Sequence, residues 1–177
     1  MKRIAVLLPV ILAACNSGPS VTATNASVEE VSNKVAAAQG SGNFIRPGQW
    51  TSKATVNLEM PGMDKMPPET VQKMKEAASK GVEATTCVTE ADVKSPKAGM
   101  FGGDKSCRYD HYTMAGGTID AKLTCEAQGQ KRVMTVKGTY SADSYHIEST
   151  AEAGPMGKMS STIDAKRTGE CTGKEKS

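Results

Sequence analysis

The clearest pattern in this chain is an alternation of apolar and polar side chains that begins at Trp50 and runs to Met60. A period of two places alternate side chains on opposite faces of a strand, so this segment is predicted to be a half-buried β-strand. The same pattern predicts further strands, separated by short turns, over 107–115, 118–127, 131–140, 144–153 and 158–168. Strands joined by such short turns pair antiparallel. The sequence therefore predicts a mainly β domain: a curled antiparallel meander or open barrel of about six to seven strands with one or two short helices.

Two segments have a helical pattern instead. Ser27 and Glu30 have the spacing of a capping box, and a stripe of valines follows them, which predicts a short helix over 28–38. A second helix is predicted to begin at Pro67-Pro68 and to end at Gly81, because proline suits a first turn and glycine suits the end. Its apolar stripe consists of Val71, Met74 and Ala78.

One stretch of sequence occurs twice. Residues 118–126 match residues 162–170 at seven of nine positions. Either two strands have converged on similar residues or a hairpin has been duplicated, and the sequence leaves both interpretations open.

The first residues predict export. A short cationic start precedes an apolar run over 4–12, which is typical of a signal peptide and too short for a hydrocarbon core that requires about twenty residues. The run ends in Leu12-Ala13-Ala14-Cys15, the pattern of a bacterial lipobox, in which the cysteine is acylated and becomes the new N-terminus. The alternative is an ordinary signal peptide, but its cleavage prefers a small residue where Leu12 stands. We therefore predict a lipoprotein signal peptide over 1–14 and lipidation of Cys15.

The lipid anchor also predicts a location. Two or more acyl chains make membrane attachment stable. Asn16 follows the lipidated cysteine, whereas an aspartate at that place retains lipoproteins in the inner membrane, so we expect an outer-membrane lipoprotein that faces the periplasm. Residues 15–46 are rich in Ser, Thr, Asn, Ala and Gly and are predicted to be the lipidated cysteine and a tether with a short helix. A β-rich, disulfide-stapled domain is expected over 47–177.

Composition narrows the possible functions. Of the 177 residues, 38% are hydrophobic and 4% are aromatic, which excludes a polytopic membrane protein, a coiled coil and a large aromatic-rich enzyme core. Removal of Lys2 and Arg3 with the leader lowers the net charge from +3 to +1. No basic surface predicts binding to nucleic acid.

Cysteine usage agrees with an oxidising compartment. Apart from Cys15, the chain has an even set of four cysteines, which predicts two disulfides in an exported protein. Their spacing contains no CxxC pair, which argues against a zinc site. We expect Cys87–Cys107 to close a stretch that has little hydrophobic reason to be ordered beyond one capped turn. Cys125–Cys171 would then pin the chain end to the meander, and this second bridge would require the sheet to curl.

Several short motifs occur in a fixed order along the chain. They are Arg46-Pro47-Gly48-Gln49-Trp50, Met60-Pro61-Gly62-Met63, Met66-Pro67-Pro68, Cys87-Val88-Thr89-Glu90-Ala91, Cys107, Cys125 and Gly169-Glu170-Cys171. In this order, and with this layout of four cysteines, they resemble the bacterial envelope family called domain of unknown function 3617. The resemblance covers residues 45–171 and implies a secreted or lipidated β-rich domain, without an established activity.

Side chains with catalytic chemistry are scarce. His111 and His146 each lie next to a tyrosine in a predicted strand and away from any nucleophile motif, so we expect no enzyme, no catalytic residue and no cofactor. Methionine is the one suggestive excess. Met60, Met63 and Met66 have the spacing MxxMxxM, and thioethers select Cu(I), although methionines also pack cores and adaptable apolar grooves.

Two functions stay open. The first is a non-enzymatic binding or structural module of the cell envelope, held at the membrane by its N-terminal lipid and able to bind an apolar small molecule or an envelope protein. Small inward-facing residues such as Ala54, Ala121 and Ser149 leave room for a pocket in such a sheet. The alternative is a methionine-based Cu(I) binding protein or oxidant sink.

Overall fold

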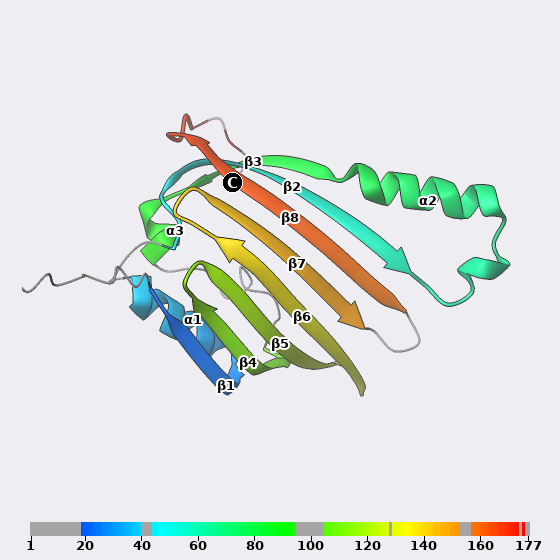
Figure 1. Ribbon diagram of the computed structural model, residues 1–177, viewed down its shortest axis with the longest axis horizontal. Coiled ribbons are helices and arrows are strands. Elements are labelled where there is room, and N and C mark those ends of the chain that lie inside the picture. Colours follow the sequence, from blue (N-terminus) through cyan, green and yellow to red (C-terminus); the bar gives the residue numbers. More distant parts are fainter. Residues whose placement is uncertain are drawn as a thin grey trace, which may run out of the picture.

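The described residues of the computed structural model, 19–39, 44–94, 105–127, 129–152, 157–173 and 175, form one eight-stranded sheet. All neighbouring strands are antiparallel, and the strand order is β1-β4-β5-β6-β7-β8-β2-β3 (Figure 1). The strands are β1 (Val21–Ser27), β2 (Gly48–Glu59), β3 (Val82–Val88), β4 (Cys107–Ala115), β5 (Thr118–Ala127), β6 (Gln130–Tyr140), β7 (Ser144–Glu152) and β8 (Lys158–Gly169). The helices within these ranges are α1 (Val28–Gln39), the 3-10 turn η1 (Met63–Lys65), α2 (Pro68–Lys80) and α3 (Glu90–Lys94).

The mainly β class is confirmed, but the sheet has more strands than the six to seven expected. β2 and β4 through β8 lie where the alternation predicts them, and β1 and β3 are the additional strands. In β1 the alternation is interrupted at Asn25, which has a φ of 48° and lies at a break in the pairing with β4. In β3 the side chains from Val82 to Thr86 are all exposed, so no buried face marks the strand in the sequence. The sheet is open, with β1 and β3 as its edges.

The predicted helix starts are confirmed in detail. The backbone N–H of Ser27 donates to Glu30 Oε2 at 2.7 Å, and the backbone N–H of Glu30 donates to Ser27 Oγ at 3.1 Å, which is the reciprocal capping box. Thr89 and Asp92 repeat this arrangement at α3. α2 follows Pro67 and has no side-chain cap. α3 is the capped turn expected after Cys87, and it brings the number of described α-helices to three.

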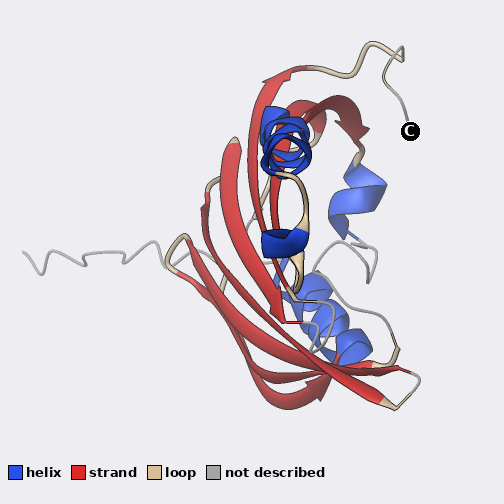
Figure 2. Cartoon of the chain, turned by 90° about the vertical axis from the view of Figure 1, so that its right-hand side faces the viewer, coloured by secondary structure: helices blue, strands red, loops and turns tan. Residues whose placement is uncertain are grey.

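The sheet is strongly bent, and α1 and α3 lie on its concave side (Figure 2). The strand register places apolar positions opposite one another across the sheet, as with Leu123 and Met134, and with Tyr145 and Ala165. The concave face is therefore apolar. The convex face carries the threonines and charged residues of the same strands.

The best-packed core lies under α1. Val31 and Val35 of α1, Tyr109 of β4 and Leu123 of β5 are fully buried and belong to one apolar cluster. Tyr109 and Tyr112 pack edge to face with ring centroids 5.3 Å apart. Burial raises the pKa of Tyr109 to about 12, so this phenol stays neutral.

The expected disulfide pairing, Cys87–Cys107 and Cys125–Cys171, is wrong. Cys107 is bonded to Cys125 across the β4–β5 hairpin, with Cα atoms 3.9 Å apart. Cys87 at the end of β3 is bonded to Cys171 beyond the end of β8, with Cα atoms 5.4 Å apart. All four cysteines therefore form disulfides, with partners other than those predicted.

A β-bulge at Asp110 decides which residue Cys107 meets. The register of β4 against β5 shifts around Asp110, which is an extra residue in β4. If every residue of β4 had a partner in β5, counting back from the pairing of Ala115 with Thr118 would place Cys107 opposite Glu126. Because Asp110 is left without a partner, Cys107 lies directly opposite Cys125. Alternation alone does not reveal such an extra residue, so the sequence analysis missed the pairing.

The second disulfide crosses over β2. Gln49 of β2 pairs with Cys87 on one side and with Gly169 on the other, which brings Cys171 close to Cys87. The bend of the sheet is thus present without the Cys125–Cys171 bridge from which we had argued for it (Figure 2).

The predicted signal peptide 1–14 and the lipidation site Cys15 lie outside the described residues. Part of the segment expected to be a tether is folded: β1 joins the sheet, α1 packs on it, and together they contribute Val21, Val28, Val31 and Val35 to the core. Within the described part of the chain, no helix is both long enough and apolar enough to span a membrane.

Candidate functional site

The concave face is covered on one side and partly open on the other. Leu123 and Ala121, close to α1, are 0% and 3% exposed, whereas Met159 and Val56 on the far strands are 45% and 38% exposed. The partly buried or exposed apolar side chains beyond β5 are Met134, Val136, Ile147, Ala151, Met159, Ile163, Val56 and Leu58, and we call them the open concave face. Ser149 and Ser161 also lie on this face, and their hydroxyl groups form a hydrogen bond with each other at 2.7 Å.

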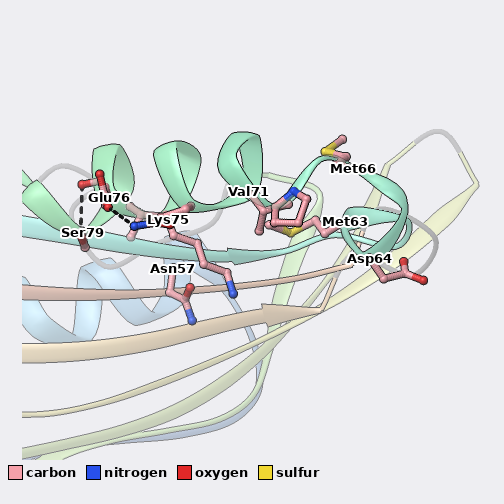
Figure 3. Close-up of a pocket in the computed structure, with 11 residues that line it drawn as sticks. Asn57, Met63, Asp64, Met66, Val71, Lys75, Glu76 and Ser79 are labelled. Atoms are coloured by element: carbon pink, nitrogen blue, oxygen red, sulfur yellow. Dashed lines mark hydrogen bonds between the residues drawn. The ribbon is translucent and has the colours of Figure 1, made fainter.

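A groove of about 630 Å³ adjoins this face where α2 runs beside the end of β2 (Figure 3). Its apolar lining comes from Val56 of β2, Met63 and Met66 around η1, and Pro68 and Val71 of α2. Val71 and Met63 point toward β2 in Figure 3. We call this site the α2 groove; its volume lies within the range of about 300–1,000 Å³ that is typical of small-molecule sites.

The α2 groove exists because a helix takes the place of a strand. β3 pairs only with the Gly48–Ala54 part of β2, so Thr55–Glu59 has a strand partner, β8, on one side only. α2 runs along this unpaired edge, and none of its residues is buried. A strand would pair with this edge through backbone hydrogen bonds, which a helix does not form. α2 therefore lies less close to β2 than a paired strand would, and the groove is the space between them.

The polar side chains of the groove form its rim. Gln72 Nε2 donates to Glu76 Oε1 at 2.8 Å, and the Ser79 hydroxyl donates to the Glu76 carbonyl at 3.1 Å. Asp64 and Lys75 add one charge of each sign. The residues that line the groove include no histidine and no cysteine. This arrangement can hold an apolar body with a polar end directed outward.

Two of the three methionines of the MxxMxxM spacing lie at this groove. Met63 and Met66 line it, and the backbone N–H of Met60 donates to Met63 Sδ at 3.3 Å. In Figure 3 the Met63 side chain points toward β2, whereas the Met66 side chain lies above the start of α2. The methionines thus contribute apolar lining, and Cu(I) binding by Met60, Met63 and Met66 stays a prediction.

The two histidines lie on the convex face, each beside an aspartate of the repeated stretch. His111 contacts Asp120 through Nε2, and His146 Nδ1 lies 2.7 Å from Asp164 Oδ1. His146 Nε2 also lies 3.4 Å from Glu148. The hydrogen bond with Asp164, followed by the one with Glu148, raises the pKa of His146 above its usual 6.5.

These contacts bear on the repeat in the sequence. Asp120 and Asp164 occupy equivalent positions of the repeated stretch, and each contacts a histidine of the neighbouring strand. His146 lies directly opposite Asp164, whereas Asp120 lies opposite Thr113, so the two contacts differ in register and both interpretations of the repeat stay open. The histidines do not gather with further ligands: among the described residues, no group of three or more His, Cys, Asp or Glu side chains could hold a metal ion.

Sequence reasoning did not predict the α2 groove. The stripe of Val71, Met74 and Ala78 is visible in the sequence, but the sequence does not show which element the stripe faces. The sequence contains no sign that β3 ends opposite Ala54 and leaves the last part of β2 without a second partner. The groove follows from that strand length.

The fold and the site together define an open, bent antiparallel β-sheet domain with two disulfides, whose apolar concave face is only partly covered by helices. Within this class, the chain belongs to the family described as Protein of unknown function (DUF3617), which matches residues 45–171 and therefore well over half of the chain. The family resemblance of the motifs is confirmed. The match leaves β1 and α1 outside it. Neither the search of the curated proteins nor that of the solved structures returned a match.

Proposed function

We propose that this chain is an outer-membrane lipoprotein facing the periplasm that binds an apolar or amphiphilic small molecule without catalysing a reaction. The binding site is the α2 groove together with the adjoining open concave face. One observation carries this proposal: the fold leaves apolar side chains accessible on both surfaces, which share Val56, and Val56, Met66 and Met159 are 38%, 40% and 45% exposed. Contiguous exposed apolar surface of this kind marks binding sites in folded proteins.

The chemistry of the lining supports a small ligand with an apolar body. Met63 and Met66 are unbranched and polarisable, so they adapt to ligands of different shape. Lys75 and Glu76 stand at the rim, where they can contact a polar end group while water still solvates them.

The location rests on the N-terminal sequence. The Leu12-Ala13-Ala14-Cys15 lipobox and the following Asn16 support a lipid anchor in the outer membrane. The disulfides Cys87–Cys171 and Cys107–Cys125 support an oxidising compartment such as the periplasm.

Ligand binding is tested with a matched pair of charge insertions. Val71→Lys places a charge in the α2 groove, whereas Val82→Lys places the same charge on an exposed valine of β3 outside the groove. With N-phenyl-1-naphthylamine as an apolar fluorescent probe, Val71→Lys is expected to abolish most of the binding and Val82→Lys to leave it unchanged. Equal binding by both variants would remove the groove from the proposal.

Native mass spectrometry of the protein extracted from membranes gives an independent test. A co-purified apolar molecule that is lost in Val71→Lys supports the proposal. Stoichiometric copper, lost when Met60, Met63 and Met66 are replaced by leucine, would support the methionine-based alternative instead. For the anchor, Cys15→Ser is expected to release the protein from the membrane fraction or to leave it unprocessed.

A further inference from the structure

The two ends of the bent sheet differ in what they carry. At one end lie the start of β1, the β4–β5 turn, the β6–β7 turn and the start of β2, and we call this the anchor end (Figure 1). Its parts are hydrogen-bonded to one another: the Tyr140 N–H donates to the Gly117 carbonyl, and the Arg46 N–H donates to the Ala142 carbonyl, both at 2.8 Å. The opposite, distal end carries the β5–β6 turn, η1 and the start of α2 (Figure 1).

The predicted lipid attachment site must lie close to the anchor end. The Tyr140 hydroxyl, at the end of β6, donates to the Pro19 carbonyl at 3.4 Å, which fixes the chain there before β1 begins. Cys15 precedes Pro19 by four residues. Because a fully extended chain spans at most about 3.6 Å per residue, Cys15 lies within about 14 Å of Pro19 whatever path the chain takes.

The turns at the two ends differ in charge. The β4–β5 and β6–β7 turns contain Gly116, Gly117, Ser141, Ala142 and Asp143, and this single charge is paired with Arg46. The end of β8, which also lies at the anchor end, adds Lys166 and the ion pair of Arg167 with Glu170. The distal end instead exposes a series of charged residues: Glu59, Asp64, Lys65, Glu126, Lys131, Glu152 and Lys158. Since desolvation of a charge is costly, the β4–β5 and β6–β7 turns, whose one charge is paired, approach a lipid surface at lower cost than the distal end does.

The α2 groove lies far from the anchor end. Val56 is eight residues along β2 from Gly48, which corresponds to about 26 Å at 3.3 Å per residue. Met63 and Met66 lie beyond the end of β2, at the distal end itself (Figures 1 and 3).

We infer that the domain stands end-on at its anchoring bilayer, with the β4–β5 and β6–β7 turns against the lipid headgroups and the α2 groove directed away from them. This inference rests on the proposed lipidation of Cys15. It adds the source of the ligand: the groove receives an apolar molecule from the aqueous side of the periplasm, or from a carrier there, and not from the bilayer that holds the anchor.

Site-specific quenching tests the orientation in the full-length, lipidated protein. Ser141→Cys at the anchor end and Lys131→Cys at the distal end are a matched pair, because both residues are exposed turn-flanking positions. The native cysteines are disulfide-bonded or acylated, so a thiol-reactive fluorophore labels only the new cysteine. In vesicles of phosphatidylethanolamine and phosphatidylglycerol with a spin-labelled headgroup lipid, quenching at position 141 is expected to be several-fold stronger than at position 131.

Two controls separate the causes of this difference. The Cys15→Ser form, added to the same vesicles, is expected to show no quenching at either position. A spacer of twenty Gly and Ser residues between Asn16 and Ser17 adds a root-mean-square reach of about 25 Å and is expected to reduce the difference. A difference that survives the spacer still supports the orientation and assigns it to the sparsely charged turns.

Other outcomes overturn the inference in distinguishable ways. Equal quenching at the two positions, or stronger quenching at 131, with a protein that floats with the vesicles would overturn the end-on orientation while the anchor stands. A protein that does not float with the vesicles would overturn the proposed lipidation and the orientation with it.

Discussion

The helices α1 and α2 are of similar length, but they pack against the same sheet to different extents. α1 buries Val28, Val31 and Val35 in the core, whereas α2 buries none of its residues. α1 is capped by Ser27 and Glu30, and α2 has no side-chain cap. The contrast indicates that burial under α1 stabilises the fold, so that the α2 side of the sheet can expose apolar surface without loss of the core.

The disulfides follow the same division. Cys107–Cys125 lies within the hairpin under α1 and closes a short loop, with a sequence separation of 18. Cys87–Cys171 holds β3 and the chain end on the α2 side, with a sequence separation of 84. The side with the smaller core is thus the one held by the long-range crosslink.

Removal of Cys87–Cys171 is therefore expected to have the largest effect. In the chain-entropy model, the loss of a loop of this size lowers the free energy of unfolding by about 4–5 kcal/mol. We expect Cys87→Ala with Cys171→Ala to show this loss in urea denaturation, with amide exchange fastest in β3 and α2. The matched control is Cys107→Ala with Cys125→Ala, for which the shorter loop predicts about 3 kcal/mol of loop entropy. A cost below about 1 kcal/mol for the first pair would contradict the proposed role of the long crosslink.

Matched valine truncations measure the two helices directly. Val31→Ala in α1 removes two buried methyl-sized groups and is expected to cost about 2 kcal/mol of unfolding free energy. Val71→Ala in α2 makes the same chemical change at a partly exposed position and is expected to cost less than about 0.5 kcal/mol. Helix propensity improves equally in both variants, so the difference reports burial. Equal costs in thermal or urea unfolding would refute the contrast between the helices.

The cap of α1 is expected to contribute a smaller amount. Ser27→Ala removes the hydroxyl that accepts from the Glu30 N–H, which is expected to cost about 1 kcal/mol. Asn33→Ala, at an exposed position of the same helix, serves as the control and is expected to be neutral or slightly stabilising. The comparison is made by urea denaturation, and a larger loss for Asn33→Ala would show that the cap does not hold the helix start.

The smallest expected effect concerns pH and the convex face. The folded pKa of His146 is raised by Asp164 and Glu148, so its contribution to stability is fully present below the unfolded pKa. That contribution is lost as pH rises through the folded pKa, in the window just above 6.5. Because the group is exposed, we expect only a slight decline in stability across this window.

NMR titration of the imidazole checks this prediction. Asp164→Asn is expected to lower the pKa of His146 toward its usual value, since it removes the main cause of the shift. The corresponding change at the other hairpin, Asp120→Asn beside His111, should leave His146 unaffected. An unchanged pKa of His146 in Asp164→Asn would show that the hydrogen bond does not persist in solution.

Local signals were enough for most of the elements. The alternation from Trp50 and in the hairpins after residue 106 predicted β2 and β4–β8, and the Ser27–Glu30 spacing predicted the start of α1. These signals succeed because capping and alternation depend on residues within one turn or one strand. β3 was missed because all its residues from Val82 to Thr86 are exposed, which leaves no alternation to detect.

The candidate site was less predictable from the sequence. The apolar stripe of α2 and the methionines of the Met60–Met66 segment were recognised, but their placement beside an unpaired part of β2 was not. The length of β3 decides that placement, since β3 stops opposite Ala54. The residue at which a strand ends depends on its pairing with a neighbouring strand. Local patterns in a single sequence do not reveal that pairing.

By itself, the sequence determined the mainly β class, the family, the positions of six strands and two helices, and the set of four disulfide cysteines. Only the tertiary structure decided the disulfide partners, because one extra residue at Asp110 shifts Cys107 from Glu126 to Cys125. It also decided which helix is packed and which one leaves a groove. The physical reason is the same in both cases: periodicity fixes which face a side chain takes, whereas register and strand length fix which neighbour it meets.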